Sequence, residues 1–344
     1  AKEFEKFGFN LAYKNFFDTL KLIPPESVKA KDFYLKALDH KINLRLFLDN
    51  TIGLSLDETT SKEDLEKLLS LLKELEKNTV AVKEDYLLHK SFLREDKILK
   101  QSVFTSYHSE TKFSRYVRQL EEKDLSLLHS MMPLGSCTMK LNAACELEPV
   151  SFKGFSALHP FVPEEQSLGY QKLLKETESM LASLSGFSAV SLQPNSGAQG
   201  ELAGLCVIKA YFEDRSELER NICLIPSSAH GTNPASAVMA GFQVKTVECD
   251  KNGNVDLNDL QAKVKESAKG LACLMMTYPS THGVFEKEVR TICQLIHSAG
   301  GQVYMDGANL NAQLGLCRPA SYGVDVAHFN LHKTFCIPHG GGGP

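Results

Sequence analysis

From residue 189 onward the chain repeats one pattern, in which a short apolar run ends in small or polar residues and is followed by a segment of helical character. Six runs are expected to be strands: Ala189–Gln193, Ile222–Ile225, Val244–Glu248, Leu271–Thr277, Val303–Met305 and Val326–Asn330. Strands that alternate with helices at this spacing predict an α/β fold with a mainly parallel sheet and helices on both faces. Ligands of such sheets bind beyond the carboxyl ends of the strands, so functional residues are expected there.

The first part of the chain has a different pattern. Residues 42–47 and 51–56 alternate apolar and polar side chains on either side of the turn-forming pair Asp49-Asn50, which predicts a hairpin. Thr60 or Ser61 is then placed to cap a helix with a leucine stripe. We predict a small α/β unit over residues 1–82 and a large domain over residues 83–344.

Composition excludes several classes of protein. The 38 Lys and Arg residues are scattered among 42 Asp and Glu, so no basic stripe for nucleic acid is present. No apolar run approaches the roughly 20 residues that a membrane-spanning helix needs. Nine cysteines without CxxC pairing, such as Cys206, Cys223 and Cys273, suit buried thiols in a reducing compartment. We expect a soluble protein that binds neither nucleic acid nor membrane.

A possible anion-binding turn follows the first expected strand. Ser196, Gly197 and Ala198 open a helical segment at Leu202–Phe212, and the N–H groups of a helix's first turn can bind a phosphate. Ser-Gly before a helix is also a common simple cap. The segment lacks the spacing of a nucleotide P-loop or a dinucleotide fingerprint, so the phosphate of another cofactor stays open.

Two charged residues follow later strands. Asp306 ends the strand Val303–Met305 and precedes Gly307-Ala308; it is either a turn residue or the partner of a protonated ring nitrogen. Lys333 comes just after the strand Val326–Asn330. It is either a lysine whose ammonium reaches solvent or one that forms a Schiff base. An anion-binding turn, an acid and a lysine in this order on one sheet are the fixed points of a pyridoxal phosphate site.

Histidines and hydroxyls occur at the same edge. His230 lies in a turn after the second strand, where an imidazole could stack on a flat cofactor, although a plain turn histidine is an equal alternative. Thr281 and His282 follow the fourth strand and could bond a phenolic oxygen or a substrate carboxylate. No metal is expected, because no HExxH is present and His328 and His332 lie in a strand-like run.

Five longer motifs add a specific resemblance. They are Pro133–Asn142, Gln193–Glu201, Ser228–Ser236, Asp306–Asn309 and Asn330–Pro344. With these motifs the chain resembles the P-protein of the glycine cleavage system, a glycine dehydrogenase (decarboxylating), from about residue 40 to its end.

The resemblance implies the large domain of the aspartate-aminotransferase type of pyridoxal-phosphate transferases and a role for each candidate residue. Lys333 would carry pyridoxal 5'-phosphate covalently, and His230 and His332 would join it in catalysis. The remaining cofactor contacts would be Asp306 at the ring nitrogen, Ser196, Gly197 and Ala198 at the phosphate, and Thr281 and Ala308. Ser136, Cys137 and His282 would surround the substrate.

The resemblance also implies partners and an extent. Glycine would lose carbon dioxide, and the aminomethyl group would pass to the lipoyl arm of H-protein, in a bacterial cytoplasm or a mitochondrial matrix. The family continues past the final glycine run, so we expect a missing C-terminal small domain, an N-terminal tail of a preceding related half, and other halves or subunits in a dimer. Alternatives are another pyridoxal-phosphate lyase or transaminase, or a non-catalytic assembly fragment.

Overall fold

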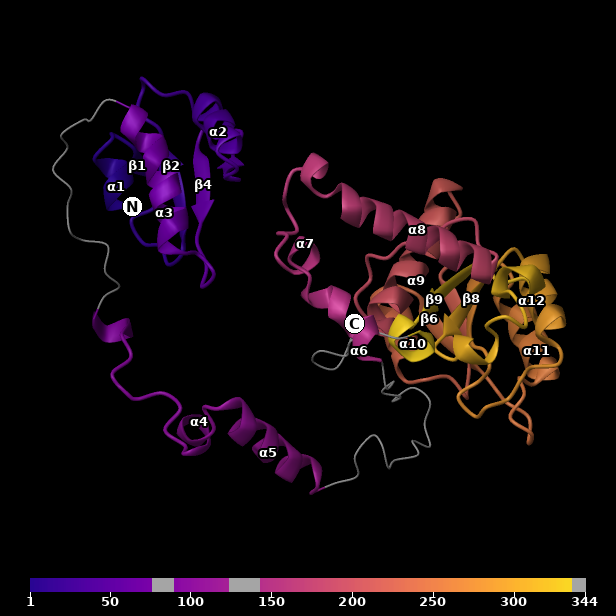
Figure 1. Ribbon diagram of the computed structural model, residues 1–344. Helices are drawn as coiled ribbons and strands as arrows, with labels where there is room; N and C mark the ends of the chain where they lie inside the picture. The colour runs from indigo at the N-terminus through magenta and orange to yellow at the C-terminus, as the bar shows by residue number, and fades with distance from the viewer. Residues whose placement is uncertain (76–89, 124–142, 336–344) are drawn as a thin grey trace. The chain divides into compact units, whose positions relative to one another are not determined.

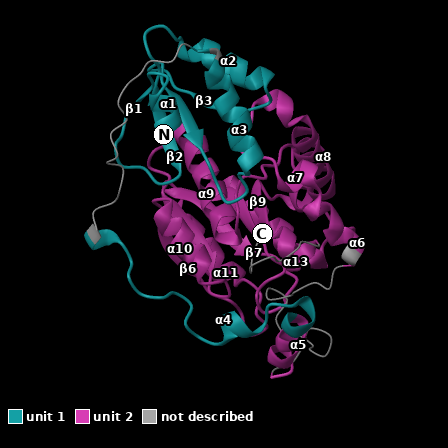
Figure 2. Ribbon diagram, turned by 60° about the vertical axis from the view of Figure 1, so that its left-hand side comes forward, with its two compact units in different colours: residues 1–113 teal, residues 114–344 magenta. Residues whose placement is uncertain are grey.

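The computed structural model describes residues 1–75, 90–123 and 143–335, and it divides into two compact units (Figure 2). Unit 1 is Ala1–Phe113 and unit 2 is Ser114–Pro344. The boundary predicted near residue 82 lies outside the described residues and stays a prediction.

Unit 1 is built on a four-stranded antiparallel sheet in the order β1-β2-β4-β3. Its elements are α1 (Lys2–Glu5), β1 (Asn10–Leu11), β2 (Thr19–Ile23), α2 (Ala30–Asp39), β3 (Arg45–Leu46), β4 (Ile52–Ser55), α3 (Lys62–Ser70), a 3-10 turn (Leu71–Glu74), a second 3-10 turn (Lys90–Phe92) and α4 (Val103–Ser106). Helix α5 (Glu110–Glu121) begins in unit 1 and continues in unit 2.

Two local predictions for unit 1 are confirmed. Strands β3 and β4 pair antiparallel as the expected hairpin, with Arg45 opposite Gly53 and Leu46 opposite Ile52. Ser61 caps α3, because its hydroxyl accepts from the Asp64 N–H at 3.1 Å while the Asp64 carboxylate accepts from the Ser61 N–H at 2.9 Å.

Unit 2 contains a five-stranded, fully parallel sheet in the order β6-β5-β7-β8-β9 (Figure 1). Its elements are α6 (Ala144–Leu147), a 3-10 turn (Glu148–Ser151), α7 (Lys153–Ser156), a 3-10 turn (Glu164–Gln166), α8 (Leu168–Ser185), α9 (Gly197–Asp214), β5 (Ile222–Pro226), α10 (Thr232–Met239), β6 (Gln243–Val247), α11 (Leu257–Ser267), β7 (Leu271–Thr277), α12 (Val289–Ser298), β8 (Gln302–Gly307), 3-10 turns at Leu310–Ala312 and Pro319–Tyr322, β9 (Val326–Phe329) and α13 (Leu331–Thr334).

Five of the six predicted strands are present, and the sixth prediction is wrong. Residues 189–193 alternate between exposed and half-buried positions, but they form no strand. The sequence pattern reports this alternation, whereas a strand also needs a hydrogen-bonding neighbour. Among the described residues β6 and β9 are the edge strands of this sheet, and residues 189–193 pair with neither.

The sheet buries both of its faces. One face packs on α9 and α10 through residues such as Leu205, Ile225 and Tyr304. The other packs on α11 and α12 through residues such as Leu274, Ile292 and Met305. Because a parallel sheet covered on both faces leaves only the strand ends accessible, polar side chains gather at those ends.

The cysteines follow this layering only in part. Cys223 and Cys273, on β5 and β7, are buried as predicted. The hydrogen bond with the neighbouring Cys223 thiol, together with burial, raises the pKa of Cys273 well above its usual range. Cys206 is exposed, which corrects the expectation from its apolar surroundings, because it lies on the side of α9 away from the sheet.

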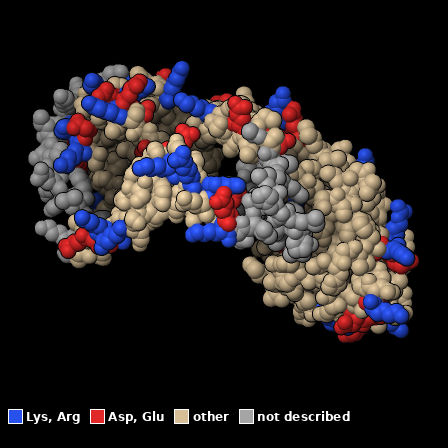
Figure 3. Space-filling model, turned by 60° about the horizontal axis from the view of Figure 1, so that its bottom comes forward, with Lys and Arg blue, Asp and Glu red and all other residues tan. Residues whose placement is uncertain are grey.

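Charged side chains of both signs are interspersed on the face of the molecule drawn in Figure 3. Within the described ranges, no helix has the length and apolarity that crossing a bilayer requires.

Glycine 204 lets α9 approach the sheet closely. A Cβ atom at this position would lie 2.5 Å from Cε2 of the buried Tyr304 ring and 3.0 Å from Cγ1 of Val326. Helix α9 therefore rests directly on β8 and β9.

We expect Gly204→Ala to lower the free energy of unfolding by about 1–3 kcal/mol, because overpacking against a buried ring outweighs the better helix propensity of alanine. Gly169→Ala is the matched control, since a Cβ in α8 at Gly169 meets no atom within 4 Å. Urea unfolding followed by circular dichroism measures both. A Gly204→Ala protein as stable as the control would contradict the close packing.

Glu286 is a buried acid in the connection from β7 to α12, with 5% of its surface exposed. Burial raises the pKa of Glu286, and the charges of Asp250 and Glu288 raise it further. The Val255 N–H, which donates to Oε1 at 3.1 Å, partly offsets this rise.

We expect Glu286→Gln to stabilise the protein near neutral pH. The unfolded carboxyl ionises near 4.5, whereas the folded one ionises at a higher pH. Wild-type stability therefore falls as the pH rises from the unfolded to the folded pKa, and the glutamine variant avoids this loss. Melting temperatures of both proteins between about pH 4 and pH 8 test this, with exposed Glu213→Gln as the control. A difference that does not grow with pH would refute the assignment.

Candidate functional site

Asp306 is the centre of the polar cluster at the carboxyl end of the sheet. It is the second-last residue of β8, and 3% of its surface is exposed. Its Oδ1 accepts from the Ala308 N–H at 2.9 Å, and its Oδ2 accepts from the Asn233 side chain at 3.0 Å. These donors hold the buried side chain of Asp306 in one orientation.

His328 meets the same carboxylate from the neighbouring strand β9. Its Nε2 lies 3.3 Å from Asp306 Oδ1 and 3.2 Å from Asn330 Oδ1, both of which are acceptors. Its Nδ1 lies 2.7 Å from the Tyr304 hydroxyl. Burial and the nearby charge of Asp306 raise the pKa of Tyr304 well above its usual range, so this hydroxyl keeps its proton and donates to Nδ1. The histidine then donates from Nε2 toward Asp306.

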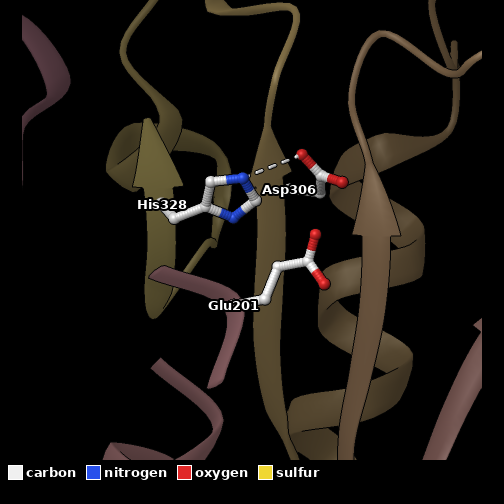
Figure 4. Close-up of side chains that lie close together, drawn as sticks. All are labelled: Glu201, Asp306 and His328. Atoms are coloured by element: carbon white, nitrogen blue, oxygen red, sulfur yellow. Dashed lines mark ion pairs between the residues drawn. The ribbon is translucent and has the colours of Figure 1, made fainter. Parts of the chain in front are cut away.

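Glu201 is a second buried carboxylate in this cluster, also 3% exposed. Figure 4 shows Glu201 on α9 pointing toward Asp306 and His328, and one side-chain atom of each lies within 4.8 Å of the others. Such spacing also occurs in metal sites. Here protein donors already use both oxygens of each acid, so we interpret the cluster as hydrogen-bonded side chains.

The start of α9 lies beside the chain that leads to Lys333. Ser196 is the N-cap, and its hydroxyl accepts from the Gln199 N–H at 3.2 Å. The N–H groups of Gly197 and Ala198 belong to the first turn, which has no acceptors within the helix. A Cβ on Gly197 would lie 2.6 Å from the side-chain nitrogen Nδ2 of Asn330, so the start of α9 contacts the residue that follows β9.

Lys333 and His332 lie on the single turn α13, directly after β9. Both are half-buried, and the Lys333 N–H donates to the Asn330 carbonyl at 3.0 Å. The next hydroxyl, Thr334 Oγ1, is buried without a hydrogen-bond partner within the described part of the chain. An orphan donor beside the lysine is available to a ligand.

His230 is exposed in the turn before α10 and bonds through Nδ1 to Thr232 Oγ1 at 2.8 Å. Thr281 and His282 are exposed in the loop after β7. That loop is tied to the turn after β8, because the Asn309 side chain donates to the Pro279 carbonyl at 3.0 Å. No hydrogen bond joins Thr281 or His282 to Asp306 or Lys333 among the described residues. Ser136 and Cys137 lie outside those residues.

The structure thus groups the candidates in two sets. Hydrogen bonds and close packing join Asp306, His230 and the start of α9 with the chain before Lys333, whereas Thr281 and His282 lie on a loop at the same edge. Sequence reasoning missed the residues that connect the first set, which are Glu201, Asn233, Tyr304, His328 and Asn330. For Glu201 a signal existed, since a lone acid precedes the apolar stretch 202–212.

Three comparisons place the chain among known proteins. Residues 162–342 match the beta-eliminating lyase family, and residues 1–72 match the glycine cleavage system P-protein family. A glycine dehydrogenase (decarboxylating) from Thermosynechococcus vestitus is 54% identical over an alignment of 348 positions, which covers 100% of this chain and 36% of the relative. The mitochondrial enzyme of that name from Gallus gallus is 52% identical over 349 residues, 100% of this chain and 35% of the relative.

The chain therefore spans about a third of the length of the curated relatives it matches. A crystal structure of a glycine decarboxylase (P-protein) in inhibitor-bound form superimposes with a TM-score of 0.60 at 17% identity, over 83% of this chain and 61% of that one. At this identity the likeness shows the fold alone, and it confirms the predicted α/β class of the aspartate-aminotransferase type. Together these matches show that the chain belongs to the glycine cleavage system P-protein family, with its larger part in the beta-eliminating lyase family.

Proposed function

We propose that this chain binds pyridoxal phosphate on Lys333 and contributes the cofactor site for decarboxylation of glycine. In this proposal the aminomethyl group passes to the lipoyl arm of H-protein, and further P-protein halves or subunits complete a dimer. The observation that carries the proposal is the buried Asp306 carboxylate, held at the end of the strand next to the one that leads to Lys333.

The residues present fit this cofactor in three respects. The first turn of α9 offers the N–H groups of Gly197 and Ala198 and the Ser196 cap to a phosphate. Asp306 offers a fixed negative charge to a protonated ring nitrogen. Thr334 Oγ1, beside Lys333, offers a hydroxyl that no group in the described ranges uses.

Each residue then has a defined task. When bound, pyridoxal phosphate supplies an electron sink for the electron pair that remains on glycine after carbon dioxide leaves. Asp306 keeps a proton on the ring nitrogen, and Ala308 and Asn233 keep Asp306 in place. Lys333 Nζ would hold the cofactor covalently and, when free, would accept or return a proton at Nζ.

The other candidates surround this centre. His230 would stack on the ring, and His332 adjoins Lys333 on the same turn. Thr281 and His282 supply a hydroxyl and an imidazole from the loop after β7, toward the cofactor face and the substrate carboxylate. The roles of Ser136 and Cys137 near the substrate rest on the family motif that contains them.

We expect the chain to develop the absorbance of a lysine–cofactor linkage when it is mixed with pyridoxal phosphate. Lys333→Ala should abolish that band, because only this lysine follows β9 at the cofactor edge. Lys251→Ala, on an exposed turn, is the control and should retain it. Borohydride reduction followed by peptide mapping identifies the labelled lysine. A band that survives in Lys333→Ala would disprove the proposed attachment.

The substrate is tested by exchange of labelled carbon dioxide into the carboxyl group of glycine. We expect exchange only when lipoylated H-protein is added, since the family reaction passes the remaining group to the lipoyl disulfide. Exchange without it would favour another pyridoxal-phosphate lyase or a transaminase. Cofactor binding without exchange under either condition would favour an assembly fragment.

A further inference from the structure

Glu201 is a buried charge for which the proposed chemistry has no use. Glutamate is almost never fully buried without strong partners, because its charged form loses hydration. Here Oε1 accepts from the Thr232 hydroxyl and Oε2 from the Ser236 hydroxyl, each at 2.8 Å. Thr232 and Ser236 are four residues apart and lie on one face of α10. Glu201 therefore fixes the first turns of α10 against α9.

The Thr232 hydroxyl has a second contact, with His230 Nδ1 at 2.8 Å. A hydroxyl has one proton, and a carboxylate can only accept, so this proton belongs to the bond with Glu201. The histidine must then donate from Nδ1 to Thr232 Oγ1. The Thr232 backbone N–H also approaches Nδ1, at 3.2 Å, and would need an unprotonated nitrogen. Because the hydroxyl contact is shorter and is polarised by the carboxylate, it determines the tautomer.

We propose that Glu201 is a positioning residue that fixes the ring direction and the tautomer of His230 through Thr232. The neutral imidazole carries its proton on Nδ1 and leaves Nε2 unprotonated. This role deepens the proposed function, on which it rests only for the placement of His230 at the cofactor face.

The direction of the effect follows from the proton on Thr232. Without an acceptor at position 201, the hydroxyl is free to donate to His230 Nδ1, and the Thr232 backbone N–H then donates to the same unprotonated nitrogen. The proton of the ring then moves to Nε2. In the wild type Nε2 can accept a hydrogen bond or a proton, whereas in the other tautomer it only donates. The chemistry available to His230 therefore changes although the residue is still a histidine.

The experiment uses the 344-residue chain labelled with ¹⁵N-histidine, without cofactor, at a pH where the imidazole is neutral. Nitrogen chemical shifts distinguish the two tautomers, and His230→Asn assigns the signal. We expect Nδ1–H in the wild type. Glu201→Met removes the acceptor at similar volume, and Thr232→Val removes the hydroxyl at similar shape. Both should shift the ratio toward Nε2–H by about tenfold or more, since a charge-assisted bond is roughly twice as strong as a neutral one.

Ser236→Ala is the matched control, because it removes the other hydrogen bond to Glu201 and leaves Thr232 in place. Its tautomer should stay Nδ1–H. An Nε2–H wild type, or an unchanged tautomer in folded Glu201→Met, overturns the proposal. If circular dichroism shows that Glu201→Met does not fold, Thr232→Val decides, and an unchanged tautomer there overturns it. No cofactor is present, so failure here is distinct from loss of the Lys333 linkage.

Discussion

Two carboxylates are buried within 4.8 Å of each other at the carboxyl end of a parallel sheet, and the arrangement of the surrounding elements follows from the need to supply them with donors. Asp306 receives hydrogen bonds from Ala308 and from Asn233 on α10, and it faces His328 on β9. Glu201 receives them from two hydroxyls on α10. Unpaired, each acid would cost several kcal/mol of desolvation. Paired as they are, they connect α9, α10, β8 and β9.

These connections explain how residues far apart in the sequence are positioned together. The N-terminus of α9 contacts the end of β9 at Gly197, and Gly204 lets the same helix rest on Tyr304. Tyr304 in turn donates to His328, which faces Asp306. A shift of α9 would therefore displace both the turn proposed to bind phosphate and the acid proposed to hold the ring nitrogen. Packing and polar contacts support the same geometry.

Membership in the P-protein family gives this site its proposed substrate and partner. The residues themselves support a narrower statement, namely that the start of α9, a fixed acidic side chain and a lysine lie at one edge of the sheet. The chain spans about a third of its relatives, so glycine decarboxylation and transfer to H-protein remain proposals about a larger protein.

The sequence by itself determined the class of fold, five of the six expected strands, the β3-β4 hairpin and the Ser61 cap, because each depends on local periodicity or on a side chain bonding to nearby backbone. It also identified Asp306, Lys333 and the start of α9 as candidates, since strand ends are visible as breaks in apolar runs. Only the tertiary structure decided that residues 189–193 pair with no described strand, because pairing depends on a distant neighbour. It alone joined Glu201, Thr232 and His230, which are up to 31 positions apart. Hydrogen bonds between side chains on different elements leave no period in the sequence, so they are set only when the helices pack on the sheet.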